Sequence, residues 1–156
     1  MIVLAIDTAG VDCAAAVFDS GIGKLLGRVS ETIGRGHAER LMAMIEDVLS
    51  SAGLGLSDLD RLAVTVGPGS FTGIRVGVAA ARGLALALKI PSVGVSTLET
   101  MAKSALRDHP GQAVIAAMDA KREEIYAQVF GPDGSALTPP AIVSLEDLQQ
   151  LADRHA

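Results

Sequence analysis

The sequence predicts an α/β fold in which helices pack against one mixed β-sheet. Short apolar runs bounded by turn residues recur along the first hundred positions, and segments with helical periodicity separate the later runs. A glycine-proline-glycine corner at 67–69 joins one apolar run directly to a helix of small residues. Because 49% of the 156 residues are apolar but only 3% are aromatic, the core has to consist of Ala, Val, Leu and Ile.

The first half of the chain is expected to begin with three strands and a helix. Apolar runs place the strands at 1–7, 13–19 and 24–32, a spacing typical of an antiparallel meander. Helical periodicity follows at 37–52. The remaining elements are a strand at 61–66, a helix at 72–88, a strand near 91–95 and a helix at about 97–107. The order β-β-β-α-β-α-β-α is that of a ribonuclease-H-like lobe.

The chain is predicted to divide into an N-terminal lobe, 1–107, and the start of a second, incomplete lobe, 108–156. The linker Asp-His-Pro-Gly-Gln at 108–112 separates them. Beyond it we expect strands at 113–119 and 124–130, and a last helix at 145–154 that opens with the capping box Ser144-x-x-Asp147. Both a naturally short second lobe and a truncated one are compatible with this pattern.

Charge and composition limit the classes of protein. A formal net charge of −5 argues against an independent nucleic-acid binder. The single Cys13 cannot form an internal disulfide, and no basic leader precedes Asp7, so a cytoplasmic protein is expected. The segment 73–90 is apolar enough for a membrane helix, but Arg75, Arg82 and Lys89 interrupt it. We therefore expect a buried helix of a soluble protein.

The usual catalytic signatures are missing from the sequence. His37, His109 and His155 lie far apart without the spacing of a helical zinc site, and we expect His37 to make a local hydrogen bond beside Glu39. No P-loop is present, and Ser70 lacks the flanking glycines of a hydrolase elbow. No catalytic residue or metal ligand is therefore assigned.

The glycine corner is the best candidate for a binding site. Its glycines permit a tight turn, and a hydroxyl that caps the following helix leaves backbone N–H groups converging at one point. An acid at the end of the first strand commonly faces the cleft of such a fold. Candidate contacts for an anion, a nucleotide or a partner's loop are Asp7, Thr8, Gly67, Gly69, Ser70 and Thr72. The alternatives are a ligand-free turn at the corner and an Asx-turn at Asp7. The charged hairpin 119–124 is read as a solvated turn or a partner contact.

With these motifs in place, the chain resembles the TsaB (YeaZ) family of bacterial tRNA threonylcarbamoyladenosine proteins. The match spans about 1–130, and the long glycine motif is its most specific part. The residues that carry it are Ile6–Ala9, His37–Leu41, Gly67–Gly77, Gly83–Ala85, Pro91–Glu99 and Met118–Tyr126. The resemblance implies the two-lobed fold of the superfamily that contains actin, sugar kinases and heat-shock chaperones.

The resemblance also implies a role. The TsaD-type paralogue of this family transfers threonylcarbamoyl to adenine 37 of tRNA with a metal held by a His-x-x-x-His pair, and Thr97 and Met101 stand at those positions here. It therefore implies a non-catalytic scaffold that stabilises this paralogue and helps to recruit a TsaE-type ATPase. No intrinsic cofactor is implied, ATP or ADP would sit at the complex interface, and tRNA would be met only through the complex. The alternatives are a homodimer, an independent actin-like phosphotransferase and a glycoprotease-like metallopeptidase.

Two helices supply the expected docking surface. Helix 37–52 carries a second apolar stripe beside the one needed for its core contact, and the small residues of helix 72–88 permit close helix approach. The interface residues expected on these helices are Met42, Ile45, Leu49, Gly73, Gly77 and Ala80. The alternative is that the chain's own second lobe covers this stripe.

Overall fold

The computed structural model describes residues 1–34, 36–121 and 123–155. Close contacts divide the chain into two compact units, Met1–Val95 (unit 1) and Ser96–Ala156 (unit 2). We expected the boundary at 107/108, whereas close contacts assign helix 97–108 to unit 2. Its apolar residues Leu98 and Ala102 pack in one cluster with Ala116 and Phe130, which lie beyond the expected linker.

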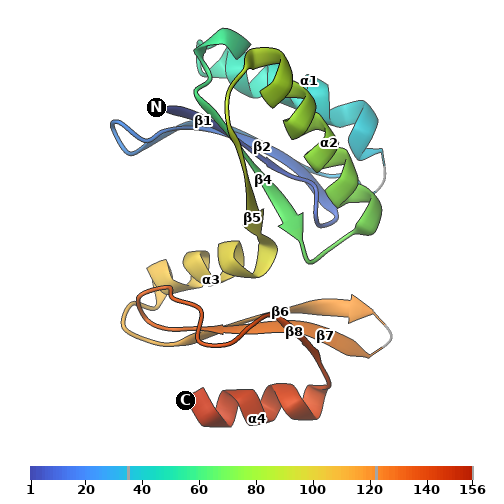
Figure 1. Cartoon of the computed structure of the whole chain (residues 1–156), viewed down its shortest axis with the longest axis vertical. Coiled ribbons are helices and arrows are strands. Elements are labelled where there is room, and N and C mark those ends of the chain that lie inside the picture. Colours follow the sequence, from blue (N-terminus) through green and yellow to red (C-terminus); the bar gives the residue numbers. More distant parts are fainter. Residues whose placement is uncertain (35, 122, 156) are drawn as a thin grey trace. The chain divides into compact units, whose positions relative to one another are not determined.

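Unit 1 is a five-stranded mixed sheet with two helices packed on one face (Figure 1). The strand order is β3-β2-β1-β4-β5; β1 pairs antiparallel with β2 and parallel with β4. Its elements are β1 (Ile2–Asp7), β2 (Asp12–Asp19), β3 (Lys24–Thr32), α1 (His37–Ser51), a 3-10 turn (Leu56–Asp58), β4 (Arg61–Gly67), α2 (Phe71–Leu88) and β5 (Ser92–Ser96). The predicted α/β fold and its element order are confirmed.

The core of unit 1 follows from the two-residue repeat of the strands. Leu4 and Ile6 of β1 point to the helix side, where they join Val17 of β2 and Leu62 of β4. Helix α1 covers this layer with a wide apolar face. Cys13 is buried in the same core, as expected for a small apolar residue, and burial raises the pKa of its thiol.

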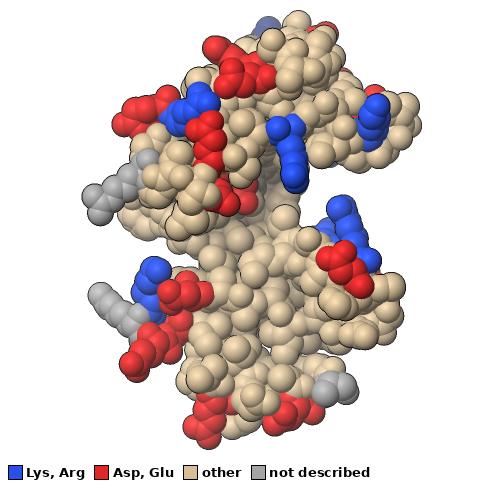
Figure 2. All heavy atoms as spheres, turned by 180° about the vertical axis from the view of Figure 1, so that it is seen from behind, with Lys and Arg blue, Asp and Glu red and all other residues tan. Residues whose placement is uncertain are grey.

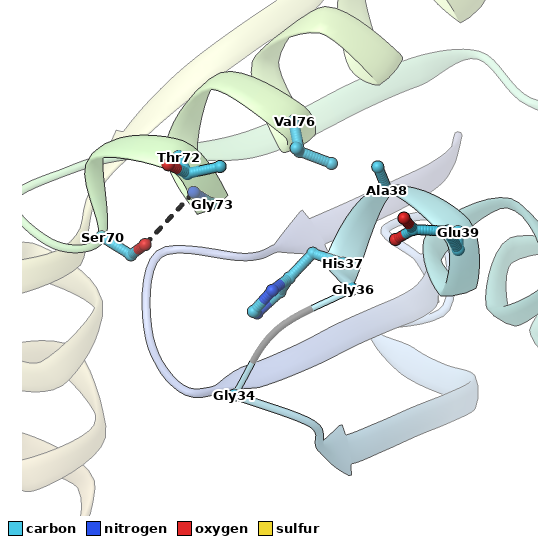
Figure 3. A pocket seen from close by; sticks show the side chains of 9 residues that line it. All are labelled: Gly34, Gly36, His37, Ala38, Glu39, Ser70, Thr72, Gly73 and Val76. Carbon is cyan, nitrogen blue, oxygen red and sulfur yellow. Dashed lines mark hydrogen bonds between the residues drawn. The ribbon is translucent and has the colours of Figure 1, made fainter.

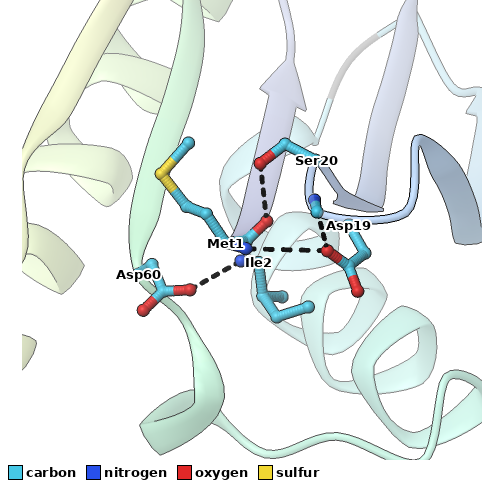
Figure 4. A network of polar contacts seen from close by, with 6 residues as sticks. Met1, Ile2, Asp19, Ser20 and Asp60 are labelled. Atoms are coloured by element: carbon cyan, nitrogen blue, oxygen red, sulfur yellow. Dashed lines mark hydrogen bonds and ion pairs between the residues drawn. The ribbon is translucent and has the colours of Figure 1, made fainter.

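Polar contacts hold the first strand at its start (Figure 4). The Ile2 N–H donates to a carboxylate oxygen of Asp60 over 2.6 Å, and the terminal amine of Met1 lies 3.6 Å from Asp19. Both the N–H and the hydroxyl of Ser20 donate to the Met1 carbonyl. These contacts join the start of β1 to the β2–β3 turn and to the residue before β4, so β1 enters the sheet in one register.

Unit 2 is a three-stranded antiparallel sheet, β6-β7-β8, with one helix on each face (Figure 1). Its elements are α3 (Thr97–Asp108), β6 (Val114–Lys121), β7 (Glu124–Phe130), β8 (Ala141–Val143) and α4 (Leu145–His155). The sequence did not predict β8 or the 3-10 turn of unit 1, because three residues are too few to show a helical or strand periodicity. The capping box is confirmed, since the Asp147 N–H donates to the Ser144 hydroxyl oxygen.

Helix α2 is only partly the buried helix that its composition suggested. Gly73, Gly77 and Ala81 are buried against the sheet, whereas Leu86 is 82% exposed. Of the described helices, α2 alone has the length and apolar composition of a membrane span. One face packs on the sheet, and the opposite face carries apolar and cationic side chains outward.

Candidate functional site

The glycine corner between β4 and α2 is shaped by close backbone packing. Gly67 and Gly69 have φ angles of 105° and 156°, which side-chain-bearing residues rarely adopt. A Cβ on Gly69 would overlap the Ala9 carbonyl, and the Ser70 N–H donates to that oxygen over 2.6 Å. The two predicted glycine contacts therefore serve the turn and its packing on the loop after β1.

The end of β1 is occupied by internal hydrogen bonds. Asp7 Oδ1 accepts from the Ala9 N–H over 2.9 Å and from the Thr65 hydroxyl over 2.8 Å, so the Asx-turn alternative describes Asp7. Thr8 is fully buried, and its hydroxyl donates to the Gly73 carbonyl over 2.7 Å. The Thr8 side chain, a candidate ligand contact, is therefore enclosed by the protein, and its hydroxyl serves an internal hydrogen bond.

A pocket of about 480 Å³ lies between the N-terminal ends of α1 and α2 (Figure 3). It brings together Ser70 and Thr72, two predicted contacts, with residues more than thirty positions earlier in the chain. The Ser70 hydroxyl caps α2 by accepting from the Gly73 N–H over 3.2 Å, as expected. The lining residues are Gly34, Gly36, His37, Ala38, Glu39, Ser70, Thr72, Gly73 and Val76.

The contacts of His37, one of the lining residues, differ from those expected from the sequence. It is 7% exposed, and its Nε2 hydrogen-bonds to the Asp12 carbonyl oxygen over 3.2 Å, rather than to a group beside Glu39. The bond joins the start of α1 to the start of β2, a tertiary contact. The only signal in the sequence was the Gly34-x-Gly36 pair before the helix, since glycines at a helix start leave room for an approaching chain.

The outward faces of α1 and α2 form one candidate docking surface, which we call the helix-pair face. Its α1 part is acidic around Met42, which is 42% exposed, and its α2 part is basic and apolar. The guanidinium of Arg75 lies over the Phe71 ring, 3.5 Å from the centroid. The members of the helix-pair face are Glu39, Met42 and Glu46 of α1, and Phe71, Arg75, Arg82 and Leu86 of α2.

Several predicted interface residues lie elsewhere. Ile45 and Leu49 are core residues, 0% and 3% exposed, because the inner face of α1 is wide enough to take both apolar stripes. Gly73 and Gly77 are buried against Thr8, and Ala80 is half-buried. Of the six predicted positions, Met42 alone is exposed, and the sequence pattern missed the charged residues around it.

Ion pairs orient α1 on the sheet. Arg40 makes two hydrogen bonds to the Glu31 carboxylate of β3, one of them Nε to Oε2 over 2.8 Å, and it also lies 3.5 Å from Asp47. The Arg40 guanidinium holds the pKa of Glu31 below its usual value. On the face seen in Figure 2, Lys and Arg side chains are interspersed with Asp and Glu, in keeping with the net charge of −5.

The positions compared with the histidine pair begin α3. The Thr97 hydroxyl is buried without a hydrogen-bond partner among the described residues, and Met101 is 40% exposed. Within 1–34, 36–121 and 123–155, no three His, Cys, Asp or Glu side chains come together as a metal site would require.

The strand order of unit 1, with its β4–α2 corner and paired helices, defines a ribonuclease-H-like lobe of the actin-like superfamily. A family model described as TsaD, tRNA N6-adenosine threonylcarbamoyltransferase, matches residues 22–154. The Escherichia coli tRNA threonylcarbamoyladenosine biosynthesis protein TsaB is 39% identical over 161 residues, which cover 97% of this chain and 68% of the relative. The chain belongs to the TsaB (YeaZ) family.

Solved structures agree with this assignment. YeaZ from Pseudomonas aeruginosa superposes with a TM-score of 0.82 at 36% identity, over 91% of this chain and 67% of that one. Component A of (R)-2-hydroxyglutaryl-CoA dehydratase from Acidaminococcus fermentans, at 16% identity, a TM-score of 0.55 and coverage of 93% of this chain and 48% of that one, shares the fold. The chain spans about two thirds of the Escherichia coli relative and 51–58% of three other curated TsaB relatives.

Proposed function

We propose that the chain is a non-catalytic subunit in the synthesis of N6-threonylcarbamoyladenosine at position 37 of tRNA. In this role it binds and stabilises a TsaD-type catalytic paralogue and helps to recruit a TsaE-type ATPase, and it meets tRNA only as part of the complex. The family membership supports the pathway. Thr97 and Met101, which stand at the metal-binding positions of the paralogue, support the accessory role.

The observation that carries the proposal is the division of charge across the helix-pair face. Acidic Glu39 and Glu46 lie on α1, and basic Arg75 and Arg82 lie on α2. A homologous subunit presents two equivalent helices, so a two-fold arrangement sets the α1 of each subunit against the α2 of the other. A partner with the same division of charge then places opposite charges together at both contacts, with Met42, Phe71 and Leu86 of this chain supplying apolar area between them.

Charge reversal tests this proposal. The double variant Arg75→Glu/Arg82→Glu should weaken binding of the purified TsaD-type paralogue by about a hundredfold or more, measured by calorimetric titration, because two attractive contacts become repulsive. The variant Arg107→Glu/Arg154→Glu in unit 2 changes the net charge by the same amount at exposed positions and should bind like the parent. Binding that is equally strong in both variants would refute docking through this face.

The same titration addresses the other classes of function. Sedimentation measures self-association of the chain. The Arg75→Glu/Arg82→Glu variant should self-associate more weakly than the parent as well, since a second copy presents the same face. Tight ATP binding by the isolated chain would instead favour an independent phosphotransferase. We expect weak binding, because the acid and hydroxyl at the end of β1 are already bonded to Ala9, Thr65 and Gly73.

A further inference from the structure

Thr8 lies directly beneath the first two turns of α2. Its hydroxyl donates to the Gly73 carbonyl over 2.7 Å, in a fully buried environment. A Cβ on Gly73 would overlap the Thr8 carbonyl oxygen, and one on Gly77 would overlap the Thr8 hydroxyl. The helix therefore approaches the end of β1 as closely as its backbone allows, and a hydrogen bond secures that approach.

Further along α2, side chains make the packing: Ala81 is fully buried, and Leu84 and Leu88 pack against the same core. Gly83 and Leu86 lie on the outward side, where a Cβ on Gly83 would meet no atom within 4 Å and Leu86 is 82% exposed. The contact with Thr8 is thus confined to the N-terminal half of α2, the part that carries Phe71 and Arg75 on its outward side. Because side chains three and four positions apart share a helix face, Gly73 and Gly77 point away from Phe71 and Arg75.

We propose that Thr8 is a positioning residue for the docking surface: it holds the N-terminal half of α2 so that Phe71 and Arg75 are presented in a fixed orientation. The inference rests on the proposed function and gives the Asp7-Thr8 motif a role within it. Asp7 contributes by accepting from Thr65, which ties the same loop to β4. Preorganisation of a surface strengthens binding because less conformational freedom is lost on association.

Isosteric replacement of the hydroxyl provides the test. Thr8→Val keeps the shape and removes the donor, so affinity for the TsaD-type paralogue should fall about fivefold, because association then has to fix the orientation of α2 that this intramolecular hydrogen bond had secured. Thr8→Ser keeps the hydroxyl and should bind within a factor of about two of the parent. Ile45→Val, on the buried face of α1, is the control for lost stability, since its expected cost is similar, and it should leave affinity unchanged.

Two further measurements separate positioning from general destabilisation. Double-mutant cycles compare the effects of paired substitutions on binding free energy. The effect of Thr8→Val should depend on Arg75→Ala, because Arg75 lies on the helix turns that Thr8 secures, and should simply add to the effect of Leu86→Ala. Amide exchange at 73–77 should be faster in Thr8→Val than in Ile45→Val at equal global stability.

The outcomes distinguish this inference from the proposed function. A parent chain that does not bind the paralogue overturns the proposed function, while the exchange measurement still tests whether Thr8 restrains α2. A parent that binds, together with Thr8→Val binding equally well or coupling equally to both surface positions, overturns the positioning role alone.

Discussion

Units 1 and 2 share a three-strand antiparallel meander followed by a helix, but they bury very different cores. In unit 1, β1, β2 and β3 are followed by α1; in unit 2, which begins with α3, the strands β6, β7 and β8 are followed by α4. Unit 1 then adds β4 to the free edge of β1 and covers the pair with α2. Its β1 is consequently a central strand with Leu4 and Ile6 buried, whereas β6 is an edge strand in which only Ala116 is buried.

A three-stranded meander therefore buries only a small core, even with a helix on each of its faces. Unit 1 gathers its large buried side chains around the strands that have partners on both sides, while the unit 2 cluster consists of Leu98, Ala102, Ala116 and Phe130. Since buried apolar area is the main source of folding free energy, unit 1 should account for most of the stability of the chain.

Truncation of a strand residue in each unit gives the largest expected effect. Leu4→Ala should lower the free energy of unfolding of unit 1 by about 3 kcal/mol, because it empties a fully buried site. Ile115→Ala, on half-buried β6, should lower that of unit 2 by about 1 kcal/mol. Urea unfolding, resolved by amide exchange in each unit, measures both. Equal losses would contradict the view that β1 gains its burial from β4 and α2.

Two glycines of α2 give a matched pair of intermediate size. Gly73→Ala should destabilise the protein by about 2 kcal/mol although alanine favours helices, because the new methyl group overlaps the Thr8 carbonyl. Gly83→Ala meets open space and should stabilise by about 0.5–1 kcal/mol. Thermal unfolding followed by circular dichroism would show opposite shifts in Tm. Shifts of the same sign would mean that α2 does not pack closely on β1.

The smallest expected difference between the units is in how much stability each loses in acid. The pKa of Glu31 is lowered by its hydrogen bonds to Arg40, so its contribution to the stability of unit 1 is present above the usual glutamate pKa and is lost as the pH falls through the lower folded value. In the Glu31→Gln variant, the free energy of unfolding of unit 1 should therefore fall less steeply than in the parent as the pH drops below about 4.5. The counterpart in unit 2 is Asp119, whose pKa is lowered by the Lys121 N–H and ammonium.

Urea midpoints at pH 7 and pH 3.5 measure this effect. The Asp119 contacts are only two residues apart and can persist in the unfolded chain, so Asp119→Asn should change the acid sensitivity of unit 2 less than Glu31→Gln changes that of unit 1. A larger effect in unit 2 would show that the long-range pair between β3 and α1 contributes little.

Local pattern was sufficient for most of the element boundaries. The three-strand opening, both long helices and the strands of unit 2 all lie within a few residues of their predicted ranges, because apolar periodicity and turn residues act over short distances. The hydroxyl cap at the start of α2 is also local and was anticipated, and the Asx-turn at Asp7 was one of the alternatives considered. The division into units was not anticipated, since nothing in the local sequence around Leu98 and Ala102 indicates which of the two sheets they pack against.

The candidate site divides in the same way. Sequence identified Ser70 and Thr72 as neighbours at a helix start, but the approach of His37 and Glu39 to them depends on how α1 and α2 pack. The sequence likewise showed that Ile45 and Leu49 belong to a second apolar stripe. It did not show that packing on the sheet buries both residues, while Met42 stays exposed.

By itself, then, the amino-acid order determined the strands, helices, turns and the family to which the chain belongs, since these depend on short-range preferences and on motifs read in one dimension. Only the tertiary structure decided that Thr8 is enclosed beneath α2, that the glycines serve close packing, and that charges of opposite sign face outward on adjacent helices. Those features depend on distances between segments far apart in the chain, and such distances are set by the packing of the whole unit.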